Sequence, residues 1–132
     1  IYADPEAFKR ILDTKIPLKL ITLDLTNKHP VTREFLEKLE DQASRSKASE
    51  LASKLWSLVK GFEYYFWDTI TAAAAIDSGL IDYKEMKLDV SVSGKNQGRT
   101  YTTLFGGRKV KVAQEMDKEN FEELLLTTFS LK

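Results

Sequence analysis

The chain has 132 residues, enough for one domain with a buried core of its own. Apolar residues make up 42% and charged residues 30%, which is typical of globular proteins and argues against disorder. Twenty basic side chains balance twenty acidic ones, so no basic excess predicts a nucleic-acid partner. The absence of cysteine excludes disulfides, cysteine-ligated metal centres and thiol nucleophiles.

Nothing in the sequence predicts a membrane partner. The longest nearly apolar run, residues 70–76, is far shorter than the ~18 residues of a membrane span, and no segment resembles a signal peptide. The compartment stays open, with the cytoplasm slightly favoured. Because the chain begins with Ile1 and not with Met, we expect a processed product or a piece of a longer protein.

The N-terminal part predicts a short helix and then a buried strand. Asp4 is a typical N-cap and Pro5 a typical first helical residue. Their apolar face is expected to carry Phe8, Ile11 and Leu12. Residues 16–25 are mostly apolar and β-favouring, which predicts a buried strand in a parallel sheet. The chain offers only one such strand, so we expect its neighbours to lie outside this chain.

Two helices are predicted next. Thr32 caps the first, whose apolar face carries Phe35, Leu36 and Leu39. Residues 41–50 are small and polar, which indicates an exposed break. A second helix then presents apolar side chains at helical spacing, which we expect to be buried: Ala48, Leu51, Leu55, Leu58 and Phe62.

The C-terminal part changes to a period of two. Residues 86–93 alternate apolar and polar side chains, and Gly94 to Gly98 predicts a hairpin turn. Strands are expected over 100–105 and 110–113, and Asp117 caps a closing helix. The predicted fold class is therefore α/β, an open sheet with a terminal antiparallel meander and a closing helix.

Residues 62–68 are the segment of the sequence with candidate functional residues. Five of six residues from Phe62 to Trp67 are aromatic, and Asp68 follows at the start of an alanine-rich helix. Asp68 is most simply a helix cap; the functional alternative is a ligand of a hard metal ion. Trp67 is either a core residue or a stacking wall for a planar ligand. His29, the only histidine, is expected to be solvated in a loop.

Taken in order, these motifs resemble the C-terminal part of the inosine–uridine-preferring nucleoside hydrolase family. The similarity covers essentially residues 1–132, which we expect to be one C-terminal segment of a nucleoside hydrolase domain that lacks its N-terminal half. The matching segments are the opening Ile1–Ala7, Pro17-Leu18 with Leu23–Thr26, Tyr65–Asp68 with Ala72–Ala74, Gly94–Thr100, and Lys109–Val112 with the Asp117 helix.

The resemblance implies a function and two site residues. In that family Ca²⁺ holds the ribose hydroxyls and a water, and most ligands come from an N-terminal Asp cluster. Asp68 matches the one calcium ligand of the C-terminal half. Trp67 stands where some members carry a leaving-group His, which implies a substrate-binding residue and a leaning to purine nucleosides.

Two functions follow as expectations. The first is a Ca²⁺-dependent nucleoside N-ribohydrolase, of which this chain alone is inactive because the Asp-rich motif is absent. Its partners would be a ribonucleoside, a missing N-terminal segment or chain and, as the family implies, further copies in a homo-oligomer. The second is a non-catalytic interaction module or subunit that keeps the hydrolase C-terminal fold.

Overall fold

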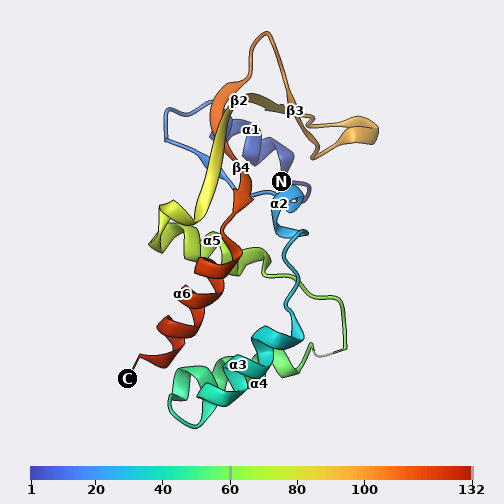
Figure 1. Cartoon of the computed structure of the whole chain (residues 1–132). Coiled ribbons are helices and arrows are strands. Elements are labelled where there is room, and N and C mark those ends of the chain that lie inside the picture. The colour runs from blue at the N-terminus through green and yellow to red at the C-terminus, as the bar shows by residue number, and fades with distance from the viewer. Residues whose placement is uncertain (60, 132) are drawn as a thin grey trace. The chain divides into compact units, whose positions relative to one another are not determined.

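The computed structural model describes residues 1–59 and 61–131, which form two compact units (Figure 1). Unit 1 comprises residues 1–20 and 83–113, and unit 2 comprises the described residues of 21–82 and 114–131. The two units differ in net charge, although the whole chain is balanced. Unit 1 has eleven Lys and Arg against five Asp and Glu, whereas the acidic residues are in excess in unit 2. No helix of the described residues is long and apolar enough to cross a membrane.

Unit 1 contains most of a four-stranded sheet and one α-helix. The sheet order is β1-β4-β2-β3, with β1 spanning Lys19–Leu20, β2 Ile81–Val90, β3 Thr100–Thr102 and β4 Arg108–Met116. β2 and β3 are antiparallel, with Leu88 opposite Thr102. The mixed α/β class is thereby confirmed. The last strand does not continue outward from β3 as in a simple meander; β4 returns to lie beside β2.

The long strand predicted over residues 16–25 was wrong. Only Lys19 and Leu20 pair, and residues Leu23–Thr26 form the short helix α2. β1 lies at the edge of the sheet and pairs in parallel with β4, so a parallel neighbour exists within this chain. The apolar run was ambiguous because a buried helical turn and a buried strand both need consecutive apolar residues.

Helix α1, Pro5–Leu12, covers the sheet of unit 1. Asp4 caps it as predicted, because its Oδ1 accepts a hydrogen bond from Ala7 N at 2.8 Å. Phe8 and Leu12 pack with the buried side chains of β2 and β4, whereas Ile11 is exposed. The remaining members of this core are Leu88, Val90, Val110 and Val112.

The turn that joins β2 to β3 contains η2, Gly94–Asn96, and ends at Gly98. Gly98 has a φ of +79°, and a Cβ there would lie 2.5 Å from Tyr2 Cα. Any other residue would therefore combine a left-handed backbone with a steric clash. The predicted turn over residues 94–98 is confirmed.

Most of unit 2 consists of α2, the short helix η1, Ser78–Leu80, and four longer helices. They are α3 Arg33–Ala43, α4 Lys47–Ser57, α5 Trp67–Ile76 and α6 Lys118–Ser130. Thr32 caps α3 and Asp117 caps α6, both as predicted. The core of this unit is aromatic: the Phe66 ring makes edge contacts with Phe35, Trp56 and Phe121 at centroid distances of 5.0–5.8 Å.

The α3–α4 region differs from the predictions in which of its side chains are buried. The break expected within residues 41–50 is present, since α3 ends at Ala43 and α4 begins at Lys47, but it is not exposed throughout: Ser46 and Ser49 are buried and donate hydrogen bonds to Phe129 O. The predicted apolar face of α4 is exposed, with Leu51, Leu55 and Leu58 between 57% and 75% accessible. Helical spacing indicates that a face is apolar, but it does not say whether that face is covered.

Candidate functional site

The candidate site is built on the start of α5. Phe66, the residue before this helix, is only 2% exposed and is held by the aromatic core. Trp67 and Asp68 follow it as the first two helical residues. The backbone at this point is therefore anchored by a large buried ring, which fixes where the next two side chains emerge.

The segment 27–31 runs beside residues 64–67 and completes the corner. Val31 N donates to Tyr64 O at 2.8 Å, and Phe66 N donates to His29 O at 3.2 Å. Pro30 and Tyr65 form an antiparallel bridge between these two bonds. Backbone hydrogen bonds thus hold this segment against residues 64–66 and bring two parts of the chain about 40 residues apart into contact.

Trp67 is half-buried and is restrained on several sides. Its indole Nε1 donates a hydrogen bond to Asn27 Oδ1 at 3.0 Å. The Tyr64 ring meets it edge-on, with centroids 5.0 Å apart, and the Tyr65 ring lies tilted at 5.5 Å. Trp67, Tyr64 and Tyr65 thus form a group of aromatic rings near the surface. The rings around Phe66 form a second, more buried group.

Asp68 is exposed and is not the helix cap that the sequence favoured. The N-cap of α5 is Phe66, which makes no side-chain capping bond, and Asp68 is the second helical residue. A carboxylate there still interacts favourably with the helix N-terminus. Among the described residues, no group of three or more His, Asp or Glu side chains could hold a metal ion. Within the described residues, Asp68 therefore has no neighbouring carboxylates or imidazoles that would complete a metal site with it.

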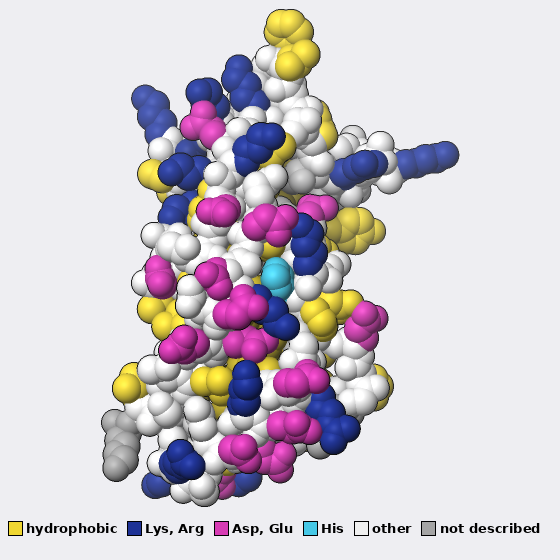
Figure 2. Space-filling view, viewed as in Figure 1, with side chains coloured by type: hydrophobic (Ala, Val, Ile, Leu, Met, Phe, Trp, Pro, Cys, Tyr) yellow, Lys and Arg dark blue, Asp and Glu magenta, His cyan; other side chains and the backbone are white. Residues whose placement is uncertain are grey.

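His29 was expected to be solvated, and this was wrong. Part of the ring reaches the surface (Figure 2), but both ring nitrogens are buried without a hydrogen-bond partner. Burial lowers the pKa of His29 below its ordinary value; the nearby Lys118 and Lys28 lower it further, and Glu115 opposes them. The buried Thr26 Oγ1 likewise lacks a partner. Burial thus disfavours the charged form of an imidazole that lies beside the candidate site.

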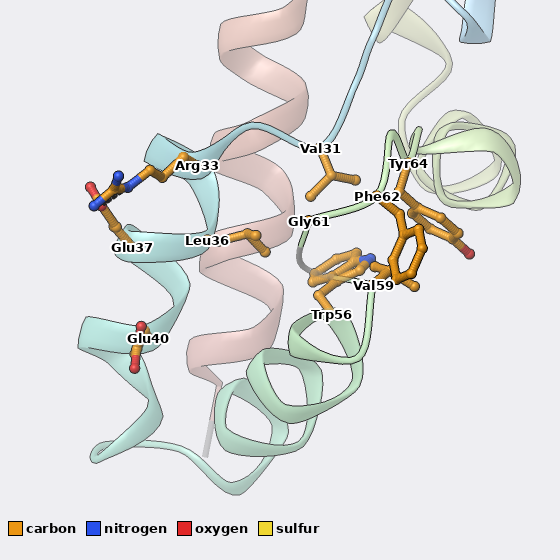
Figure 3. A pocket seen from close by; sticks show the side chains of 10 residues that line it. All are labelled: Val31, Arg33, Leu36, Glu37, Glu40, Trp56, Val59, Gly61, Phe62 and Tyr64. Carbon is orange, nitrogen blue, oxygen red and sulfur yellow. Dashed lines mark hydrogen bonds and ion pairs between the residues drawn. The ribbon is translucent and has the colours of Figure 1, made fainter.

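One hollow of unit 2 is lined by other residues. It has a volume of about 560 Å³ and lies between the start of α3 and the end of α4 (Figure 3). Its lining includes Leu36, Trp56, Phe62 and Tyr64, but neither Trp67 nor Asp68. Only Tyr64 belongs both to this hollow and to the rings around Trp67. The two predicted site residues are therefore neighbours in the chain that lie outside this hollow.

Comparisons with known proteins define the family. Residues 1–123 match the family model of inosine-uridine preferring nucleoside hydrolases, so the chain belongs to that family. It is 28% identical to Nucleoside hydrolase 3 of Arabidopsis thaliana, over 76% of this chain and 14% of that protein.

Solved structures show the same fold. An inosine-uridine preferring nucleoside hydrolase from Bacillus anthracis is 29% identical, with a TM-score of 0.86 over 96% of this chain and 41% of that one. A purine-preferring ribonucleoside hydrolase from Gardnerella vaginalis, 21% identical, has a TM-score of 0.75 over 96% of this chain and 44% of that one. The chain thus spans less than half the length of these relatives.

Sequence reasoning singled out Trp67 and Asp68 but missed Asn27 and misjudged His29. The sequence does indicate that Trp67 needs a partner, because a partly buried indole N–H requires a hydrogen-bond acceptor. It does not indicate that this acceptor is Asn27. Which acceptor the indole finds depends on the pairing of residues 29–31 with 64–66, and no local pattern predicts that pairing.

Proposed function

We propose that this chain is part of a nucleoside N-ribohydrolase, which cleaves the bond between base and ribose by adding water. Membership of the family over residues 1–123 carries the proposal. It is supported at the site by an exposed carboxylate, Asp68, directly beside a half-buried indole, Trp67. These are the side chains that a polar ribose and a flat base would each need.

Trp67 is proposed as a wall on which the leaving base stacks. A purine offers a larger aromatic surface than a pyrimidine, so this wall favours purine nucleosides. The indole Nε1–H is already donated to Asn27. Trp67 therefore acts through its face and does not protonate the leaving base, which must gain its proton from another group or leave as an anion.

Asp68 is proposed as one ligand of a Ca²⁺ ion in the complete enzyme, where the ion would bind the ribose hydroxyls. The described residues do not form a complete calcium site. Calcium takes ~6–8 oxygen ligands, and one carboxylate supplies at most two. The remaining ligands and the catalytic base would come from outside these residues, so the chain alone is proposed to be inactive and to bind calcium weakly.

Asp68→Asn in the protein expressed from its full reading frame tests this role. Its matched control is Glu34→Gln, which removes a charge at the same second position of α3. If Asp68 binds calcium, only Asp68→Asn should lower ribose release from inosine, and added calcium should restore part of it. Equal, small effects of the two variants on melting temperature and none on turnover would contradict the assignment.

The interaction-module alternative is supported by one observation. Leu51 and Leu55 of α4, with Leu58 at its C-cap, form an apolar face that the described residues leave exposed. Such a face is typical of a surface that contacts another polypeptide. A full reading frame without an Asp-rich segment, together with no ribose release from any nucleoside, would favour this alternative over the hydrolase.

A further inference from the structure

Trp67 can serve as a stacking wall only if its ring plane is fixed, and the contacts around it show how this is achieved. Two tyrosine rings limit the tilt of the indole, Tyr64 edge-on at 69° and Tyr65 at 37°. Ring contacts alone leave the indole free to flip about χ2, because either edge can face a tyrosine. The hydrogen bond from Nε1 to Asn27 Oδ1 distinguishes the two orientations.

Asn27 is itself held in place by the backbone. It ends α2, where its N–H donates to Leu23 O, and the preceding Leu25 and Thr26 are buried. Two residues later, His29 O accepts the hydrogen bond from Phe66 N. Asn27 and Trp67 thus belong to two segments that are joined by backbone hydrogen bonds. These bonds hold the amide oxygen of Asn27 close to the indole N–H of Trp67.

We propose that Asn27 is a positioning residue for base recognition, which holds the indole of Trp67 in one orientation and occupies its only N–H donor. This inference rests on the proposed nucleoside hydrolase function. Asn27 does not touch the substrate in this proposal. It makes Trp67 a purely apolar wall, which recognises the size of the base and not its pattern of hydrogen-bonding groups.

The first experiment follows the indole proton directly. In ¹⁵N-labelled full chain, the two Nε1–H resonances belong to Trp56 and Trp67, and Trp67→Phe assigns them. Asn27→Leu should shift the Trp67 resonance and speed its exchange with water, whereas Asn27→Asp keeps an acceptor and should preserve slow exchange. Asn96→Leu, the same change at an exposed asparagine, is the control. An unchanged Trp67 resonance in Asn27→Leu would overturn the proposal.

The second experiment measures recognition in the protein expressed from its full reading frame. Asn27→Leu should lower kcat/KM for inosine by about 2- to 10-fold, the value of one ordinary hydrogen bond, and should affect uridine less. Asn27→Asp should restore the preference. If the wild-type protein releases no ribose at all, the proposed function fails. If it is active and the inosine-to-uridine ratio is unchanged in Asn27→Leu, only the role of Asn27 fails.

Discussion

Replacing His29 is expected to stabilise the protein. Both ring nitrogens are buried without partners, and an unpaired buried polar group costs about 1–3 kcal/mol. Leucine has a similar volume and no polar atom, so His29→Leu should raise the free energy of unfolding by about 1–2 kcal/mol. For a chain of this size, that corresponds to a rise in melting temperature of roughly 4–7 °C.

The same variant should remove a pH dependence whose sign follows from the lowered pKa. The unfolded chain binds a proton at its ordinary pKa near 6.5, whereas the folded chain binds it only at lower pH. Between these values the unfolded state holds more protons, so stability is fully present above about pH 6.5 and falls as the pH drops toward the folded pKa. One proton limits the slope to about 1.4 kcal/mol per pH unit.

Urea unfolding of the full chain from pH 7.5 to 5.5 measures both effects. His29 is the only histidine, so it is the side chain whose ordinary pKa lies in this range. His29→Gln is the control, since it removes the titration but keeps a buried polar group. The glutamine variant should show a flat pH profile without the gain in stability. Parallel pH profiles for the wild type and His29→Leu would refute the reasoning.

Three further predictions concern other contacts. Asp89 accepts two hydrogen bonds from Lys9 at 2.8 and 3.0 Å, which lowers the pKa of Asp89; a double-mutant cycle with Lys9→Met and Asp89→Asn should give a coupling of about 0.5–1 kcal/mol that is lost as the pH falls below 3.8. Phe35→Ala should cost ~3–5 kcal/mol in urea unfolding because its side chain is 0% exposed, whereas Leu55→Ala should change stability by less than about 0.5 kcal/mol. In the active protein, Trp67→Ala should lower kcat/KM for purine nucleosides by roughly 5- to 150-fold and for pyrimidine nucleosides by less; equal losses would leave Trp67 as a structural residue.

The sequence alone determined those features whose causes are local. Asp4, Thr32 and Asp117 predicted three helix starts, because a short polar side chain before a helical pattern satisfies backbone N–H groups that have no other partner. Glycines at 94 and 98 predicted the turn after β2, since only glycine adopts its left-handed conformation without strain. The α/β class and the family followed from the order of these motifs.

Tertiary structure decided which apolar segments pair and which polar groups are buried. Nothing local distinguishes the two paired residues of β1 from the helical turn of α2, because the parallel partner of β1 lies about 90 residues further along the chain. The exposed face of α4 has the same spacing as a buried one. His29 and Asn27 occupy a polar segment that composition marks as a solvated loop. The pairing of that segment with residues 64–66 buries the imidazole and gives Trp67 its acceptor, because hydrogen bonds between distant backbone segments fix which side chains meet.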